Sequence, residues 1–262
     1  MDEVLSLAVA ALAGLVCGFL NTVASSGSAV SLPILLWLGL PAVDANATNR
    51  LPVLIGAMSA TFDLSRRKAI PWRLAILASL PTMFGTIIGA LLAERIPNAD
   101  LKLFIIAAVF VALVLILSKL KSVIKDTDKG AAHFGYREAL LLVLVGIWLG
   151  FIVLDGATYI LLVLILAAGM HLVEANAVKN VILLATTLVA MVIFASKGSI
   201  DWRLGAVMAA GSLFGGLAGA RLAVSEAAKR WIVGLLVLVI IGEIAHLLIQ
   251  SYLAMGATAS AS

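Results

Sequence analysis

Ile70-Pro71-Trp72-Arg73-Leu74 opens a long apolar stretch, and Ile200-Asp201-Trp202-Arg203-Leu204 opens a second one 130 residues later. Aligned at this offset without a gap, residues 39–93 and 169–223 are identical at 17 of 55 positions. Apolar composition alone does not bring tryptophan, arginine and asparagine residues into one register. The pattern therefore indicates an internal repeat.

The composition around this repeat is that of a membrane protein. Apolar residues make up 63% of the 262-residue chain, charged residues make up 12%, and the mean hydropathy is +1.16. Soluble proteins are typically about 45–50% apolar and about 25% charged. The net charge of +4 is expected in cytoplasmic loops rather than in a nucleic-acid interface. The single cysteine, Cys17, excludes an intrachain disulfide.

The apolar stretches predict an all-α polytopic membrane protein with 8 to 10 membrane helical segments. A helix needs about 20 apolar residues to cross the hydrocarbon core. Two of the stretches, 29–40 and 157–170, are too short to cross alone, and whether they cross or re-enter stays open. The stretches lie at 4–24, 29–40, 45–64, 73–93, 101–118, 139–154, 157–170, 175–196, 203–223 and 228–249.

The longest polar segment divides the chain into two halves. Residues 1–118 form the predicted first membrane repeat, 119–138 a basic cytoplasmic linker, and 139–252 the second repeat. Residues 253–262 form a C-terminal tail. We name the two repeats the first half and the second half.

Loop charges predict that the halves are inverted in the membrane. The basic run Arg66-Arg67-Lys68, the linker and the segment around Lys229-Arg230 are expected in the cytoplasm, which leaves both termini periplasmic. The loop Lys197–Asp201 aligns with the first basic run yet falls on the outer side. Inverted repeats with interrupted first helices are typical of secondary transporters.

Polar breaks precede the two short stretches at matching places. The first break is Ser25-Ser26-Gly27-Ser28 and the second is Asp155-Gly156-Ala157-Thr158. Irregular backbone at membrane depth is tolerated where it is buried in protein or lines a wet cavity. Each following helix is expected to direct free N–H groups at its break, which suits a small anion. The alternative is that serine and glycine allow close helix packing.

Two cations and four asparagines follow the breaks. The side chains predicted to bind an anion are Asn46, Asn49 and Arg50 in the first half, and Asn176, Lys179 and Asn180 in the second. An intramembrane cation costs at least about 2.5–3.5 kcal/mol, so it needs a partner, a cavity or a route to the interface. Arg50 and Lys179 either converge on an anion between the breaks or snorkel to the membrane surface.

Asp155 is the acid of the breaks, with three open roles: partner of Lys179, carrier of a coupling proton, or helix cap. No nucleophile with a base, no phosphate-binding loop and no metal-ligand spacing stands out. We therefore expect no enzyme activity, no catalytic residue, no cofactor and no metal. Glycines at four-residue spacing, such as Gly85 and Gly89, predict close packing inside the protein.

The chain resembles the TauE/SafE-type sulfite exporter family over essentially its whole length. The motifs are Gly18-Phe19-Leu20, Ser26-Gly27, Pro33-Ile34-Leu35, Gly39-Leu40-Pro41, Ala45-Asn46-Ala47-Thr48, Trp72-Arg73-Leu74 and Gly85 with Gly89-Ala90, together with their second-half counterparts. The resemblance implies a bacterial inner-membrane protein that moves sulfite, sulfonates or other small organosulfur anions. The first break is poorer in glycine than is usual in the family, which leaves the preferred anion open.

Taken together, the sequence predicts a secondary transporter that moves sulfite or a small organosulfur anion across the cytoplasmic membrane by alternating access. The alternative is a carrier or channel for another small anion, such as a carboxylate or an inorganic oxyanion. The expected partners are the anion, the lipid bilayer and a coupling proton or ion, with no nucleic acid. A monomer and a homodimer are both compatible with the sequence.

Overall fold

The computed structural model describes residues 3–95, 133–154 and 156–223, and within these ranges every regular element is helical. This confirms the predicted all-α class. Residues 101–118, 228–249, 253–262 and most of the linker lie outside the described residues. The helices are α1 Glu3–Val23, α2 Ser28–Trp37, α3 Ala42–Thr48, α4 Arg50–Arg66, α5 Trp72–Ala93, α7 Tyr136–Phe151, α8 Gly156–Leu162, the π-helical η1 Val163–Ala167, α9 Leu172–Lys197 and α10 Trp202–Ala223.

The length and the exposed apolar surface of several helices are those of membrane-spanning segments. In the described part, α1, α5, α9 and α10 are long and apolar enough to cross a membrane. Large apolar side chains point outward, among them Phe84 on α5, Val192 on α9 and Phe214 on α10, each more than 60% exposed. Exposed large apolar side chains on several membrane-length helices fit contact with lipid.

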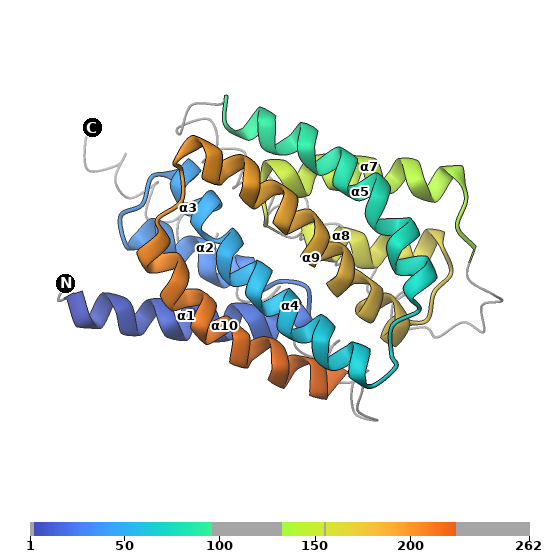
Figure 1. Cartoon of the computed structure of the whole chain (residues 1–262), viewed down its shortest axis with the longest axis horizontal. Coiled ribbons are helices and arrows are strands. Elements are labelled where there is room, and N and C mark those ends of the chain that lie inside the picture. Colours follow the sequence, from blue (N-terminus) through green and yellow to red (C-terminus); the bar gives the residue numbers. More distant parts are fainter. Residues whose placement is uncertain (1–2, 96–132, 155, 224–262) are drawn as a thin grey trace, which may run out of the picture.

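The helices form two groups that meet where α4 packs against α9, and each group takes members from both halves (Figure 1). Helices α1 and α4 of the first half pack with α10 of the second. Helices α7 and α9 of the second half pack with α5 of the first. In Figure 1 the aligned helices α4 and α9 run in opposite directions, and so do α5 and α10. The halves are thus interleaved rather than set side by side as separate units.

Backbone conformations recur at the aligned positions. Positive φ angles fall at Gly39 and Gly169, and again at Lys68 and Gly198, so both pairs keep the offset of 130 residues. Lys68 and Gly198 follow the ends of α4 and α9, where a left-handed residue closes a helix C-terminus. The repeat seen in the sequence therefore extends to turn geometry.

One predicted stretch differs between the halves. Residues 45–64 form two helices, α3 and α4, with a junction at Asn49, whereas the aligned α9 is continuous. Pro52 lacks the N–H that would bind the carbonyl of Thr48, and its ring crowds that carbonyl. The aligned residue in α9 is Ile182, which keeps the helix intact. Proline at this position starts α4 instead of continuing α3.

Glycines bring the helices of opposite halves into backbone contact. A Cβ added to Gly85 or Gly89 of α5 would lie 2.0 or 1.9 Å from a carbonyl oxygen of α7. Gly146 and Gly150 of α7 approach α5 equally closely, and Gly14, Gly18, Gly211 and Gly215 do the same between α1 and α10. The prediction of internal packing is confirmed, and the contact lies between the halves.

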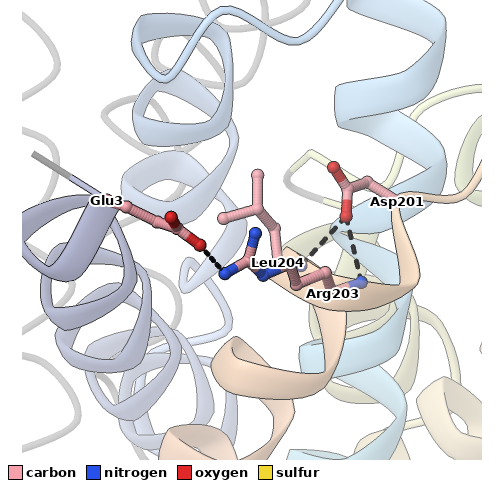
Figure 2. Close-up of polar contacts among 4 residues, drawn as sticks. All are labelled: Glu3, Asp201, Arg203 and Leu204. Carbon is pink, nitrogen blue, oxygen red and sulfur yellow. Dashed lines mark hydrogen bonds and ion pairs between the residues drawn. The ribbon is translucent and has the colours of Figure 1, made fainter. Parts of the chain in front are cut away.

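Helix α10 begins at a side-chain cap. Asp201 accepts hydrogen bonds from the backbone N–H groups of Arg203 and Leu204, both at 3.0 Å (Figure 2). Arg203 also forms an ion pair with Glu3 of α1. The aligned start of α5 has Pro71 at this place and no side-chain cap. The cap therefore fixes the residue at which α10 begins, next to α1.

Candidate functional site

Helices are interrupted at the first predicted break and just before the second, since Gly156, Ala157 and Thr158 already belong to α8, and the two regions are in contact. Helix α1 ends at Val23 and α2 begins at Ser28, while α7 ends at Phe151 and α8 begins at Gly156. The hydroxyl of Thr158, in the first turn of α8, donates to the carbonyl oxygen of Ser25 at 3.2 Å. Positions 133 residues apart are thereby joined, and the breaks of the two halves form one region.

Side chains hold the first break in shape. Ser25 adopts a left-handed conformation with φ of 64°. The N–H of Gly27 donates to Asn21 Oδ1 at 2.9 Å, and the N–H groups of Ala29 and Ser31 donate to break carbonyls. Several N–H groups that we expected to be free for an anion are therefore already bound. Donors for a ligand must come mainly from side chains.

Asn46 holds the second break. Its Nδ2 donates to the carbonyl of Phe151 at 2.9 Å, and its Oδ1 accepts from the N–H of Val153 at 3.2 Å. One amide thus bridges the residues where α7 ends. The aligned Asn176 makes no such bridge, and both of its side-chain polar atoms are buried without a partner among the described residues.

Arg50 is buried at the start of α4, with 1% of its surface exposed. Its two terminal nitrogens donate to the carbonyls of Leu149 and Gly150, at 2.9 and 2.6 Å. The guanidinium also lies over the ring of Phe194, 4.7 Å from its centre. The Nε atom has no partner among the described residues. Arg50 therefore keeps donor capacity inside the protein.

Lys179 is buried in α9, with no exposed surface. Its Nζ donates to the carbonyls of Asn21 and Thr22, at 2.6 and 3.2 Å, and to the hydroxyl of Ser25 at 3.1 Å. An ammonium has three N–H donors, so these acceptors fill its capacity. Neither Lys179 nor Arg50 reaches the surface, so the alternative that they snorkel is wrong.

Both cations bind the negative end of a helix dipole. The last four carbonyls of a helix lack intrahelical partners and carry about half a negative charge together. Arg50 of the first half binds such carbonyls on α7 of the second, and Lys179 binds those on α1 of the first. No carboxylate of the described residues pairs with either cation. Among the described residues, each full positive charge is thus met by partial charges only.

Unpartnered polar atoms gather on the residues predicted to bind an anion. Asn49 Nδ2 and Arg50 Nε are buried donors on consecutive residues at the start of α4, and Asn49 accepts a hydrogen bond from Ser31 at 2.5 Å through its Oδ1. The set of buried atoms without a partner on predicted site residues is Ser26 Oγ, Asn49 Nδ2, Arg50 Nε, Asn176 Nδ2, Asn176 Oδ1 and Asn180 Oδ1. In a dry interior each such group carries a desolvation penalty.

The remaining predicted residues are distributed as follows. Ser28 and Gly156 are buried in the first turns of α2 and α8. Asn180 donates to the carbonyl of Asn176 within α9. Asp155 lies outside the described residues, so its three predicted roles stay open. No group of metal-ligating side chains occurs among the described residues.

Three residues were missed by the sequence reasoning. Asn21 accepts a hydrogen bond from Gly27 in the first break, and Ser31 donates one to Asn49. Phe194 lies under the Arg50 guanidinium. Asn21 and Ser31 are polar residues inside apolar stretches. Polar side chains in membrane segments cost free energy to insert, so they often mark functional positions. Phe194 carried no such signal, because an aromatic residue in an apolar helix is ordinary.

Comparison with known proteins identifies the group to which this chain is related. The model of the family described as sulfite exporter TauE/SafE matches residues 10–244. The chain belongs to the sulfite exporter TauE/SafE family. The resemblance inferred from the sequence motifs is thereby confirmed over nearly the whole chain.

Relatives in this family are described as transporters. The chain is 29% identical to a probable membrane transporter protein, ORF9, of Sinorhizobium sp., over 85% of each chain. It is 27% identical to the probable membrane transporter protein YfcA of Escherichia coli K12, over 87% of this chain and 85% of that one. No solved structure matches the chain at a significant level. The protein is a multi-pass membrane transporter of the TauE/SafE family.

Proposed function

We propose that this protein is a secondary transporter for sulfite or a small sulfonate-type anion, working by alternating access across the bacterial cytoplasmic membrane. The anion binds where the two helix breaks meet. Arg50 and Lys179 supply the positive field there, and side chains of both halves supply hydrogen-bond donors. The protein performs no chemistry on its cargo.

One observation carries this proposal: two fully buried cations bind helix-end carbonyls, and Arg50 Nε and the side chains of the neighbouring residues Asn49 and Asn180 include buried polar atoms without a partner among the described residues. Charges inside a membrane protein mark substrate or ion pathways, because their insertion cost is otherwise uncompensated. An anion supplies the missing negative charge. A sulfite or sulfonate group adds several acceptor oxygens for arginine and amide donors.

The interleaved halves suit alternating access. We propose that they are inverted repeats with 8 to 10 membrane segments, with the basic loops cytoplasmic and both termini periplasmic. The opposite directions of α4 and α9, and of α5 and α10, support this proposal (Figure 1). In such transporters one group of helices rocks against the other around a central site.

The test of cargo is ligand-induced thermal stabilisation of the purified protein in detergent. The panel contains sulfite, thiosulfate, sulfoacetate, taurine, sulfate and acetate at matched ionic strength. An anion at about 100 times its Kd stabilises the folded state by about 2.7 kcal/mol. Stabilisation by sulfite or sulfoacetate, but not by acetate, supports the proposed cargo. Stabilisation by acetate alone, or by none of the anions, contradicts it.

Flux through proteoliposomes tests the mechanism. A carrier that alternates its access shows faster uptake of labelled anion when the same anion is present inside. We expect this acceleration for the anion that stabilises the protein most. Uptake that does not respond to internal anion, at rates above those of carriers, contradicts alternating access and indicates a channel.

A further inference from the structure

The two buried cations differ in the donor capacity that they have left. All three N–H donors of Lys179 are taken, by the carbonyls of Asn21 and Thr22 and the hydroxyl of Ser25. Arg50 has five N–H donors, of which two bind Leu149 and Gly150. Its Nε–H is buried and unpartnered among the described residues. Only one of the two cations can therefore bind an anion without giving up a contact.

From this difference we propose that Arg50 donates directly to the transported anion, while Lys179 is a positioning residue that holds the first break. The inference rests on the proposed function and assigns different roles to the two cations of that same site. Arg50 Nε is the proposed direct contact because it is a buried donor without a partner among the described residues, and Asn49 Nδ2, on the preceding residue, is a second such donor.

The surroundings of Arg50 favour a direct role. Both terminal nitrogens are anchored on α7 carbonyls, and the ring of Phe194 supports the guanidinium face. These contacts fix the plane of the group, so the Nε edge has a defined direction. Asn49 is fixed in the same way, because its Oδ1 accepts from Ser31 at 2.5 Å. Each of the two donors is therefore held in place before an anion arrives.

The surroundings of Lys179 favour a positioning role. Ser25 has φ of 64°, a left-handed conformation that a serine adopts only when other contacts hold it. Lys179 binds the Ser25 hydroxyl, and Thr158 binds the Ser25 carbonyl. The ammonium thus ties the end of α1 to the left-handed turn. Its hydrogen bonds, rather than its charge, are what the turn requires.

Neutral and charged replacements separate the two roles. Lys179→Gln keeps amide donors without a charge, whereas Lys179→Met removes both donors and charge. Arg50→Lys keeps the charge but lacks Nε and the planar group, and Arg50→Gln removes the charge as well. The readouts are the Kd of sulfite and sulfoacetate by calorimetry, and the Tm without anion, for each full-length variant in detergent.

We expect Arg50→Lys to weaken anion binding by about tenfold or more, the usual range for losing a charge-assisted hydrogen bond. Lys179→Met should lower both affinity and Tm. Lys179→Gln should restore most of the loss of Tm but only part of the loss of affinity, because the glutamine supplies hydrogen-bond donors without the positive charge. Ser25→Ala combined with Lys179→Met should lower the Tm no further than Lys179→Met alone, because both changes break the same contact.

Three results would overturn the inference. Equal loss of affinity in Lys179→Gln and Lys179→Met, with wild-type affinity in Arg50→Lys, would make Lys179 the anion ligand. Additive Tm losses for Ser25→Ala and Lys179→Met would remove the positioning role, and this measurement needs no anion. Absence of any anion binding to the wild-type protein would overturn the proposed function and the role of Arg50 together.

Discussion

Arg50 and Lys179 bind the same two carbonyl positions, counted from a helix end, in opposite halves of the protein. Arg50 binds the carbonyls of Leu149 and Gly150, the two residues before the last residue of α7. Lys179 binds those of Asn21 and Thr22, the two residues before the last residue of α1. The cations come from positions that are not aligned, since Lys179 aligns with Asn49 and Arg50 with Asn180. Each half thus supplies a cation that binds the C-terminal carbonyls of the interrupted helix in the other half.

Asn46 and Asn176 are aligned but should contribute differently to stability. Asn46→Ala removes two hydrogen bonds, and the buried N–H of Val153 loses its side-chain acceptor. Leaving a buried group unsatisfied costs about 1–3 kcal/mol. Asn176→Ala is the matched control, because it deletes the same atoms where no such bond exists among the described residues. Thermal melting should show a clearly larger loss for Asn46→Ala, and equal losses would contradict the bridging role.

Replacing glycines on α10 with alanine should lower the Tm by amounts that depend on the atom that each added Cβ would meet. A Cβ at Gly211 would lie 2.1 Å from the carbonyl oxygen of Ala11, a backbone atom that cannot move without shifting α1. A Cβ at Gly205 would lie 3.0 Å from the end of the Leu51 side chain, which can rotate away. We expect Gly211→Ala to lower the Tm strongly and Gly205→Ala to change it little. The reverse order would argue against the close contact of α1 and α10.

The cap of α10 should be visible in stability measurements. Asp201→Ala removes the acceptor for two N–H groups of the first turn, which costs about 1 kcal/mol for a typical cap. Asp201→Asn keeps an acceptor oxygen and should retain most of the wild-type Tm. Arg203→Ala breaks the exposed pair with Glu3 and should have a smaller effect than Asp201→Ala (Figure 2). A full loss in Asp201→Asn would show that charge, not capping, matters here.

Topology can be tested at the loops that close α4 and α9. Lys68 and Lys197 are both exposed, and the native Cys17 is buried, so the wild-type protein is the unlabelled control. If the halves are inverted, Lys68→Cys should react with an impermeant maleimide from the cytoplasmic side. Lys197→Cys should then react from the periplasmic side, as measured in intact cells and inverted vesicles. Labelling of both from one side would contradict the inverted arrangement.

The fold class and the helix positions were predictable from the sequence because hydropathy and length are local properties. Apolar stretches predicted α1, α5 and α10 to within a few residues. The stretch 45–64 was predicted as a single apolar segment, and the structure divides it at Asn49. Pro52 carries the sequence signal for this junction, because proline kinks a helix or starts one. The aligned residue Ile182 carries no such signal, and α9 is continuous there.

The sequence by itself determined that this is a repeated, helical membrane protein with cations near two broken helices. Composition, periodicity and the offset of 130 residues need no tertiary information. Only the tertiary structure decided that Arg50 and Lys179 bind helix ends of the opposite half. It also decided that Asn46 bridges the end of α7, while the side chain of Asn176 has no partner among the described residues. Partners 99 to 158 residues away along the chain are chosen by how helices pack, and side-chain chemistry alone does not specify which carbonyl will lie within reach.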